Sequence, residues 1–587
     1  MYTPDVAPIA DNLTLSALVA ALPLVTVFVT LGLLRWKAHW AGLTALGVAL
    51  LVAILGYRMP LDLAALSATQ GAAFGLFPIM WIVLMAIWLY ELTVRSGRFE
   101  DLRRVIDTVS DDPRIQAMII AFCFGGLLEA LAGFGAPIAI TGVMLLAIGF
   151  SKMRAATVVL VANTAPVAFG AIAIPILTAG TLTGIDYHHI GAIVGHQTPL
   201  IALFVPTFLA FLADGLRGVK EIWPIAVVVG VAFAAAQWVS ATWISVELTD
   251  VISSLVGLLA AVLMLRVWKP KGGEAARERL LGERRREDEE LAVEAAAAGR
   301  AGKATTTAEA TRASATDGTT ADAADAAGAA GTAGVGLTGS RVFLALFPYL
   351  LVIVIFALAK LWTPLTSALA ATDVKIPWPG SDGRILTAAG EVSTNTVYSF
   401  QWLSSPGTLL LITGIIVAAV YRMKPQDALE VFTRNVVKMR FSILTVVSVL
   451  SLAYVMNQAG QTITIGTWIA GTGAAFAFLA PILGWLGTAV TGSDTSANAL
   501  FATLQQTAAL KAGLDPALMV AANTSGGVVG KLISPQNLTI AATAVGLLGK
   551  ESAILRKVVW WSIGMLVALC LLNGLQSNVL AWMLPQP

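Results

Sequence analysis

Charged residues are scarce in this chain. Of its 587 residues, Asp, Glu, Lys and Arg make up only 12%, whereas 57% are hydrophobic. A soluble domain carries about 25% charged residues. The shortage excludes an ordinary water-soluble protein, because most of the surface must face something other than water. The formal net charge of +2 gives no reason to expect a nucleic-acid partner.

Cysteine is also nearly absent. Cys123 and Cys570 lie far apart, each within an apolar segment. Two separated cysteines cannot form a zinc site of the usual Cys-rich spacing. We therefore expect buried, reduced thiols, no metal and no cofactor. A cleavable signal peptide is not expected either, because acidic rather than basic residues, Asp5 and Asp11, precede the first apolar run.

Long apolar runs dominate what is present. Most are about 20 residues long, which is the length of a helix that crosses roughly 30 Å of hydrocarbon. Two stretches, 114–150 and 466–510, are too long for one span and are interrupted by Gly and small polar residues. The chain is therefore predicted to be an all-α polytopic membrane protein with the lipid bilayer as its solvent.

The basic residues suggest an orientation for these segments. Basic clusters flank both ends of 114–150. If basic clusters are cytoplasmic, 114–150 enters and leaves on one side and is a re-entrant hairpin. The stretch 466–510 then begins and ends outside. This arrangement predicts about 12 transmembrane helices plus two re-entrant helical hairpins, with both termini outside.

Composition divides the chain into three parts. Residues 1–270 form a first transmembrane half, and residues 341–587 form a second half. Between them, 271–340 is a cytoplasmic low-complexity linker in which 283–290 can continue an amphipathic helix. The Ala/Gly/Thr/Asp run that follows cannot bury a core and is expected to be disordered. A plain tether and a regulatory segment are both consistent with it.

A repeated motif relates the two halves. Ala162-Asn163-Thr164 is followed by Gly170 and Pro175, and Ala522-Asn523-Thr524 is followed by Gly530 and Pro535, so five identities share an offset of 360. The first copy lies in the apolar segment 155–180 and the second in 516–548. A Gly-rich apolar stretch precedes each copy. In the orientation above the copies run in opposite directions, which is the inverted repeat of many secondary transporters.

The residue types in the motif have a physical meaning. Asn, Thr, Gly and Pro break helices and leave backbone groups free, which is tolerable at membrane depth only where they line a cavity or are buried in protein. Helix N-termini at such breaks offer donors to a carboxylate. The alternative is that small residues only allow close helix packing. The pairing of two motifs at one offset favours a binding site.

Ionisable residues inside apolar segments are costly and therefore candidates for function. Glu129 precedes the first glycine-rich break, Asp494 lies at the second, and Lys531 follows Gly530. One alternative is that each carboxylate is structural and either caps a half-helix or pairs with a basic residue. The other is that it carries a proton. Lys531 is either paired with Asp494 or the counter-ion of an anionic substrate. The sequence does not choose between these readings.

Three motifs resemble one known family. They are Glu129-Ala-Leu-Ala-Gly-Phe-Gly-Ala-Pro-Ile-Ala-Ile140, Thr491-Gly-Ser-Asp-Thr-Ser-Ala-Asn-Ala-Leu-Phe501 and Gly530-Lys-Leu-Ile-Ser-Pro-Gln-Asn-Leu-Thr-Ile-Ala541. They look like the lactate permease family, and the resemblance extends over nearly the whole chain. It implies import of L-lactate, often also D-lactate and glycolate, with protons, through the bacterial cytoplasmic membrane. The family belongs to an ion-transporter superfamily of inverted-repeat proteins. Other members of that superfamily carry Ser-Asn-Thr motifs at their substrate and sodium sites. This chain has Ala-Asn-Thr in both copies, which favours proton coupling over sodium coupling.

These observations define a candidate site between the two broken segments. Asp494 and Glu129 are the candidates for proton coupling. The candidates for substrate binding are polar or glycine residues at the breaks: Asn163, Thr164, Gly133, Gly135, Ser493, Thr495, Ser496, Asn498, Asn523, Thr524, Ser534, Gln536 and Lys531. The sequence leaves open the preferred substrate, the proton stoichiometry, elevator versus rocking motion and homo-oligomer formation.

Other functions remain as alternatives. The nearest is a transporter or exchanger of another small carboxylate, including a sodium-coupled one. A structural subunit of a membrane complex would not transport by itself. An intramembrane aspartyl protease would need two facing aspartates. No second Asp lies within the other apolar segments, of which 251–267 is one. No enzyme activity is therefore expected.

Overall fold

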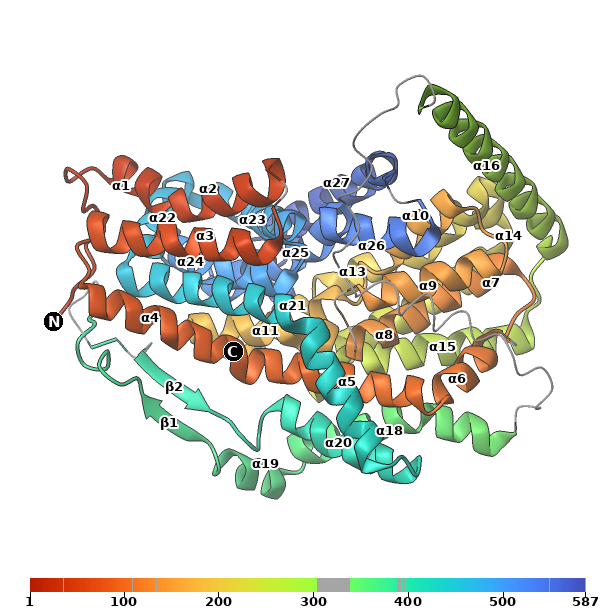
Figure 1. Cartoon of the computed structure of the whole chain (residues 1–587), viewed down its shortest axis with the longest axis horizontal. Helices are drawn as coiled ribbons and strands as arrows, with labels where there is room; N and C mark the ends of the chain where they lie inside the picture. Colours follow the sequence, from red (N-terminus) through yellow and green to blue (C-terminus); the bar gives the residue numbers. More distant parts are fainter. Residues whose placement is uncertain are drawn as a thin grey trace.

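The computed structural model describes residues 1–585 except 35, 108, 132, 134, 303–337, 388–391, 394–395 and 548. The chain is almost entirely helical, and most helices run along the long axis of the molecule (Figure 1). The low-complexity run of the predicted linker lies largely outside the described residues.

The helices before the linker are α1 (Leu13–Ala20), α2 (Leu22–Phe28), η1 (Val29–Leu33), α3 (Ala38–Leu51), η2 (Val52–Gly56), α4 (Leu61–Phe74), η3 (Gly75–Met80), α5 (Trp81–Arg95), α6 (Arg98–Asp107), α7 (Pro113–Met118), η4 (Ile119–Phe124), α8 (Gly125–Leu131), α9 (Ala136–Ala147), α10 (Lys152–Ala162), η5 (Val167–Phe169), α11 (Gly170–Thr183), α12 (Tyr187–Val194), α13 (Thr198–Ala202), α14 (Val205–Val239), η6 (Ser240–Ile244) and α15 (Thr249–Val267).

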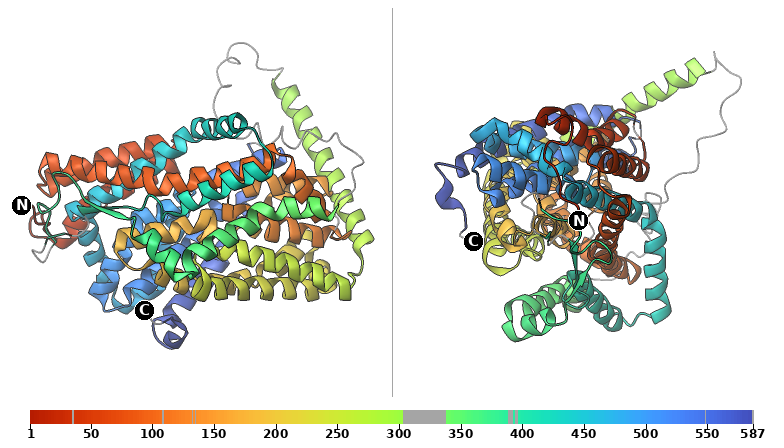
Figure 2. Two further views of the ribbon diagram at one scale, coloured as in Figure 1. Left: turned by 90° about the horizontal axis from the view of Figure 1, so that it is seen from below. Right: turned by 90° about the vertical axis from the view of Figure 1, so that its left-hand side faces the viewer.

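The elements from the linker onward are α16 (Gly273–Gly302), α18 (Gly339–Leu361), α19 (Thr363–Ala370), β1 (Val374–Pro377), β2 (Val397–Phe400), α20 (Pro406–Val420), α21 (Pro425–Ala459), α22 (Gln461–Ile469), η8 (Ala470–Ala475), α23 (Phe476–Thr491), α24 (Asp494–Ala512), α25 (Pro516–Gly530), η9 (Lys531–Ile533), α26 (Pro535–Val545), α27 (Glu551–Gln576) and η10 (Ala581–Met583). The strands pair antiparallel, with Val374 opposite Phe400. In the end view of Figure 2, α18 and α19 lie at the periphery of the bundle.

The prediction of an all-helical membrane protein is confirmed. Within the described residues, nine helices are long and apolar enough to cross a membrane, or up to eleven if two bent pairs each count as one span. The sequence predicts about 12. The numbers differ partly because some apolar stretches continue through bends, as 187–244 does, and because α20 is only 15 residues long.

The first long apolar stretch folds back on itself. Helices η4 and α8 run to a turn at Gly133 and Gly135, whose positive φ values of 48° and 87° favour glycine. Helix α9 then returns along them, so that a methyl group on Gly125 would lie 3.6 Å from Thr141 Cγ2. Residues at both ends of this hairpin contact α16: Asp112 approaches Gly273, and Gly149 approaches Leu281.

The second long stretch also contains a helical hairpin, made of α23 and α24. The turn is at Gly492, which has φ 78°. A methyl group on Gly487 would lie 2.9 Å from Ala497 Cβ, so the two helices are in close contact on either side of the turn. In Figure 1 this hairpin lies towards the end of the molecule with the N-terminus, whereas α7 to α9 lie towards the end with α16.

The two halves exchange contacts reciprocally. Helix α9 packs against α26, and α24 packs against α11. At the offset of 360, α9 corresponds to residues of α24, and α11 corresponds to residues of α26. Each hairpin therefore contacts the segment that follows the other hairpin, which is the pattern expected of two related halves around a common centre.

The two Ala-Asn-Thr segments differ in where they break. The axis bends by 62° between α10 and the helix after it, at Asn163–Pro166. In the second copy Asn523 and Thr524 lie inside the continuous helix α25, and the break follows at Lys531–Ser534. The expectation that the motif itself breaks both helices is therefore wrong for the second copy. Pro166 cannot donate an intrahelical hydrogen bond, whereas Gly526 at the equivalent position can.

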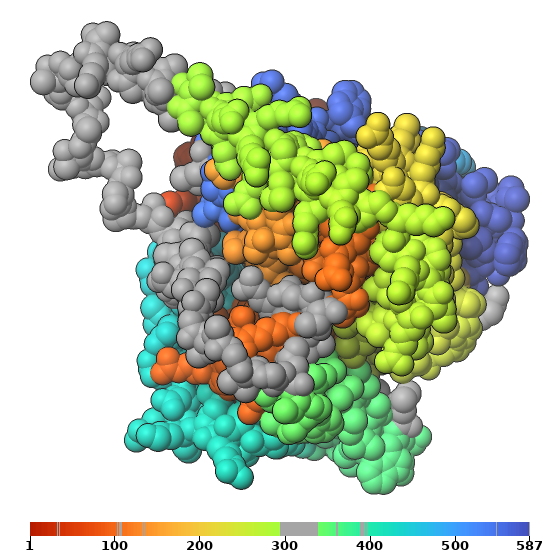
Figure 3. Space-filling view, turned by 90° about the vertical axis from the view of Figure 1, so that its right-hand side faces the viewer, coloured from red at the N-terminus to blue at the C-terminus, as the bar shows by residue number. Residues whose placement is uncertain are grey.

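Helix α16 begins in the linker and is held against the first half by polar contacts. Residues 283–290 lie within it. The Glu287 carboxylate accepts hydrogen bonds from the backbone N–H groups of Lys152 (2.5 Å) and Met153 (2.9 Å), which begin α10. Arg279 Nε donates to Asp214 Oδ1 at 2.9 Å, and this carboxylate raises the pKa of Arg279. Figure 3 shows α16 lying across this end of the molecule.

Candidate functional site

An ion pair at the centre of the fold joins the two halves. Lys531 Nζ, from the break after α25, lies 2.6 Å from Glu129 Oε1, at the end of α8 in the first hairpin. Asn163 Nδ2 donates to the other oxygen, Glu129 Oε2, at 2.9 Å. The exposed fractions are 3% for Glu129, 5% for Asn163 and 7% for Lys531. The first hairpin, the first broken segment and the second broken segment therefore meet at one carboxylate.

Because both charges are buried, the ion pair matters for the stability of the fold. Removing two charges from water costs several kcal/mol per ion, and the cost is recovered only with close geometry and further hydrogen bonds. Glycines provide the space: a methyl group on Gly170 would lie 3.0 Å from Glu129 Oε1. A methyl group on Gly133 would lie 3.9 Å from the same oxygen. The glycine of the repeated motif is thus needed for the approach of the carboxylate.

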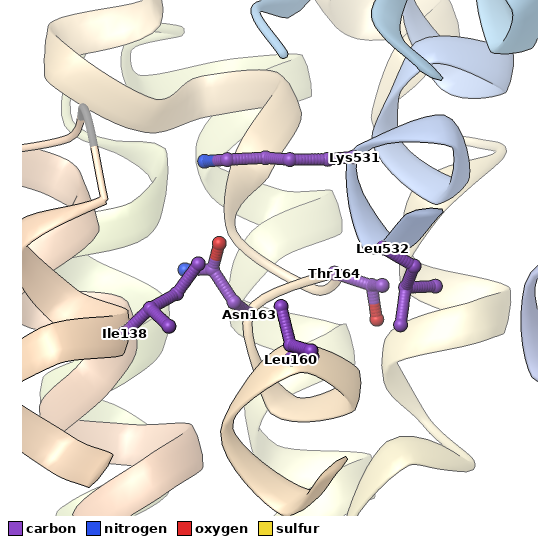
Figure 4. A pocket seen from close by; sticks show the side chains of 6 residues that line it. All are labelled: Ile138, Leu160, Asn163, Thr164, Lys531 and Leu532. Carbon is purple, nitrogen blue, oxygen red and sulfur yellow. The ribbon is translucent and has the colours of Figure 1, made fainter. Parts of the chain in front are cut away.

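Beside the ion pair lies a narrow recess. It is lined by Ile138, Leu160, Asn163, Thr164, Lys531 and Leu532. Figure 4 shows the Lys531 side chain extending from the second half across to the first, above Asn163. Asn163 Oδ1 has no hydrogen-bond partner among the described residues. The recess therefore brings together a lysine ammonium group and an unpaired amide oxygen, which can bind an anion and a hydrogen-bond donor respectively.

The second motif forms a polar cluster of its own. Asn523 Nδ2 and Thr524 Oγ1 both donate to Asn498 Oδ1, at 3.1 Å and 3.0 Å. Gln505 Nε2 donates to Asn523 Oδ1 at 3.2 Å. These side chains bond one another across α24 and α25, so in this conformation they hold the second hairpin to the helix behind it.

Asp494 begins α24 and is 4% exposed. Its Oδ1 accepts a 3.4 Å hydrogen bond from Thr488 Oγ1, and its Oδ2 has no partner in the part of the chain that the structure describes. Gly527 leaves room for it, since a methyl group there would lie 1.8 Å from Oδ1. Asp494 is within electrostatic range of Lys531, but the hydrogen-bonded ion pair is with Glu129.

Two helix N-termini meet near Asp494. Ser493 Oγ accepts from the Ser496 N–H at the start of α24, and Ser534 Oγ accepts from the Asn537 N–H at the start of α26, both at 3.3 Å. Asn537 Nδ2 donates to Gly492 O at 3.3 Å. Asn537, which the sequence did not single out, thus links the two breaks of the second half. Its position in the resembled motif, after Ser534-Pro-Gln, was the available signal.

The remaining predicted residues surround these breaks. Gly133 and Gly135 form the turn of the first hairpin, and a methyl group on Gly135 would lie 2.3 Å from Ile540 Cδ1 of α26. Gln536 lies against Gly492, since a methyl group on Gly492 would lie 2.4 Å from Gln536 Oε1. Thr495 is half-buried in the first turn of α24. The structure therefore brings Ser493, Thr495, Ser534 and Gln536 to one pair of helix ends, whereas Asn498, Asn523 and Thr524 lie in the separate cluster between α24 and α25.

A second aspartate lies in the interior, contrary to the sequence expectation. Asp250 has 0% exposure and lies in the first turn of α15. The sequence places the start of this span at residue 251, one residue after Asp250. The described residues contain no group of three or more His, Cys, Asp or Glu side chains that could hold a metal ion.

A multi-pass helical membrane protein with a buried ion pair between two broken segments has the features of a secondary transporter. Comparison with known proteins identifies the particular group. Residues 16–580 match the L-lactate permease family, and the chain belongs to that family. Its members are permeases, so the protein is a transporter and not an enzyme.

Several relatives are similar over their whole length. The chain is 39% identical to an L-lactate permease of Bacillus subtilis (strain 168), with 100% of both chains covered. It is 38% identical to the glycolate permease GlcA of Escherichia coli (strain K12), covering 100% of this chain and 99% of the relative. The solved structure of Neisseria gonorrhoeae MtrF matches with a TM-score of 0.32 and 13% identity over 84% of this chain and 85% of that one.

Proposed function

We propose that this protein imports L-lactate, and also D-lactate and glycolate, across the bacterial cytoplasmic membrane together with protons. Relatives that match over their full length are named L-lactate permease and glycolate permease. Lactate and glycolate are small 2-hydroxycarboxylates, so one site must receive a carboxylate and a neighbouring hydroxyl group. The Lys531–Glu129 ion pair is the observation that carries the proposal.

The pair offers a direct way to couple an anion to a proton. A substrate carboxylate that reaches Lys531 competes with Glu129 for the ammonium group. Once Lys531 pairs with the substrate, Glu129 is a buried carboxylate without its counter-ion, and proton uptake removes the cost of that charge. One anion and one proton then enter together, and the net charge of the site does not change.

The neighbouring polar groups fit the rest of the substrate. Asn163 and Thr164 line the recess beside Lys531, and their side chains can bond the 2-hydroxyl group. The N-termini of α24 and α26 supply backbone N–H groups and the positive ends of helix dipoles near Ser493 and Ser534. Asp494, with one unpartnered oxygen, is the second candidate proton carrier.

Transport then requires the narrow recess to open to each side in turn. We propose that the two hairpins act as the gates, because they lie towards opposite ends of the molecule and each packs against the broken segment of the other half. The reciprocal contacts support an inverted repeat, with α16 on the cytoplasmic side. Both hairpins moving together past a scaffold and the rocking of one half against the other fit this packing equally well.

Uptake by purified protein in proteoliposomes tests the proposal. We expect accumulation of labelled L-lactate when the outside is made acidic, and no accumulation with a sodium gradient at equal pH. Unlabelled D-lactate and glycolate should compete, whereas succinate and malate should compete weakly. Uptake that follows sodium and ignores the pH gradient would replace proton coupling with the sodium-coupled alternative, and strong competition by succinate would change the substrate class.

A further inference from the structure

Asp250 is a buried carboxyl group that the ion pair does not use. Its side chain has 0% exposure. Oδ1 accepts a long hydrogen bond of 3.4 Å from Gln237 Nε2 in α14, and Oδ2 has no partner among the residues described. A buried ionised carboxylate without a cation or strong donors is costly, whereas its neutral acid form is much less so and gains an O–H donor.

The charged and titratable groups around Asp250 lie on several elements. Glu129 of α8 and Lys531 of η9 act on it electrostatically. On its own segment, Glu247 is bonded by Tyr187 Oη (2.9 Å) and Ser245 Oγ (2.7 Å). Cys123 of η4 lies against Gly257, farther along α15. Lys531 is the only cation in this group, and its hydrogen-bonded partner there is Glu129 rather than Asp250.

Unpartnered acceptors extend from Asp250 towards Glu129. Gln237 Oε1 and Ser254 Oγ have no hydrogen-bond partner within the described parts of the chain. Ser254 is one turn beyond Asp250 on α15, and its Oγ would lie 2.6 Å from a methyl group on Gly126. Gly126 is one turn before Glu129 on α8. The α15 face that carries Asp250 and Ser254 therefore meets the α8 face that carries Gly126 and Glu129.

Gln237 also ties Asp250 to the first broken segment. The same Nε2 that faces Asp250 donates to Ala165 O at 3.0 Å. Ala165 follows Asn163 and Thr164, which line the recess. A change in the charge of Asp250 therefore alters its hydrogen bond with Gln237, and the Gln237 side chain also holds the backbone of the first broken segment at Ala165.

We propose that Asp250 is a second proton-binding residue of the transport cycle, holding a proton while Lys531 is paired with Glu129 and transferring it when Lys531 turns to the substrate. In that step the O–H bond of Asp250 breaks and an O–H bond forms on Glu129. Asp250 is left as a carboxylate and is reprotonated from water on the side from which the substrate entered. The inference rests on the proposed proton symport, and it adds the residue from which Glu129 receives its proton.

The test separates proton-coupled accumulation from exchange. Asp250→Asn protein in proteoliposomes is assayed for lactate accumulation under an inward pH gradient and for lactate/lactate exchange at equal pH, which requires no net proton movement. We expect accumulation to fall by roughly 10-fold or more, as for loss of a proton–substrate coupling, with exchange near that of the unmodified protein. If accumulation persists unchanged, or if a folded variant loses both processes equally, the proposal is wrong.

A matched control and a second variant keep the result clear. Asp62→Asn alters an exposed aspartate, one paired with Arg384, and should leave both assays unchanged. If Asp250→Asn does not fold, Asp250→Glu decides: it should retain exchange and shift the pH dependence of accumulation. An unshifted pH profile in that variant overturns the proposal. Failure of the unmodified protein to respond to a pH gradient would instead refute proton symport itself.

Discussion

The ammonium group of Lys531 and the carboxylate of Glu129 stabilise each other across the boundary between the two halves, 2.6 Å apart and nearly without exposure. Removing one partner of a buried pair leaves an uncompensated charge and costs about 3–5 kcal/mol. We therefore expect Lys531→Met and Glu129→Gln each to lower the unfolding temperature in detergent and to abolish lactate uptake. The double variant should recover much of the stability but not the uptake.

The exposed Arg384–Asp62 ion pair supplies the control, because its side chains are 45% and 54% accessible. Asp62→Asn should change neither the unfolding temperature nor uptake. A double variant of Lys531 and Glu129 that still accumulates lactate would show that this pair is structural only.

The residues of the ion pair were visible in the sequence, but their pairing was not. Lys531, Glu129 and Asn163 stand out because polar groups in apolar segments are costly. Lys531 and Glu129 are 402 residues apart, so only the tertiary fold decides between Glu129 and Asp494 as the partner. Asp250 was missed for a local reason: it lies in the first turn of a helix, where the boundary of an apolar run is uncertain.

At the scale of elements, glycines set how closely α23 and α25 approach. A methyl group on Gly484 would lie 1.8 Å from Asn523 O, and one on Gly526 would lie 1.9 Å from Pro481 O. The obstacles are backbone atoms, so the helices themselves must separate. This is the small-residue packing that membrane helices use, and here it brings the backbone of Asn523 against α23.

We expect Gly484→Ala to destabilise the protein by at least about 1–3 kcal/mol, the usual cost of overpacking. Its unfolding temperature in detergent and its lactate exchange should both fall. Gly564→Ala in α27 is the matched control, because no atom of the described residues lies within 4 Å of the new methyl group. Equal unfolding temperatures for the two variants would mean that α23 and α25 can separate without cost.

The sequence predicts the helix breaks better than it predicts which residues lie at them. Gly133, Gly135 and Gly492 do form hairpin turns with positive φ, because glycine adopts that conformation without steric cost. The second Ala-Asn-Thr motif resembles the first in sequence, yet α25 runs through it. There the side chains of Asn523 and Thr524 find partners on α24, while Pro166 has no counterpart that would interrupt the backbone.

At the scale of the whole molecule, the proposed inverted repeat would place the hairpins on opposite sides of the membrane. The α9–α26 and α11–α24 contacts support two related halves, the hairpins lie towards opposite ends of the molecule in Figure 1, and the basic residues predict that the end that carries α16 is inside. Glu289 is an exposed residue of α16, and Lys511 is an exposed residue near the end of α24. These two positions should therefore face opposite compartments.

Single cysteines at these positions, in a chain with Cys123 and Cys570 replaced by Ser, measure the orientation. A membrane-impermeant maleimide added to intact cells should label Lys511→Cys and not Glu289→Cys, and lysis should expose Glu289→Cys. Labelling of both from one side would contradict the inverted repeat, because the two hairpins would then open to the same compartment. Labelling in the reverse order would keep the inversion but place α16 outside, so the basic residues would no longer predict the orientation.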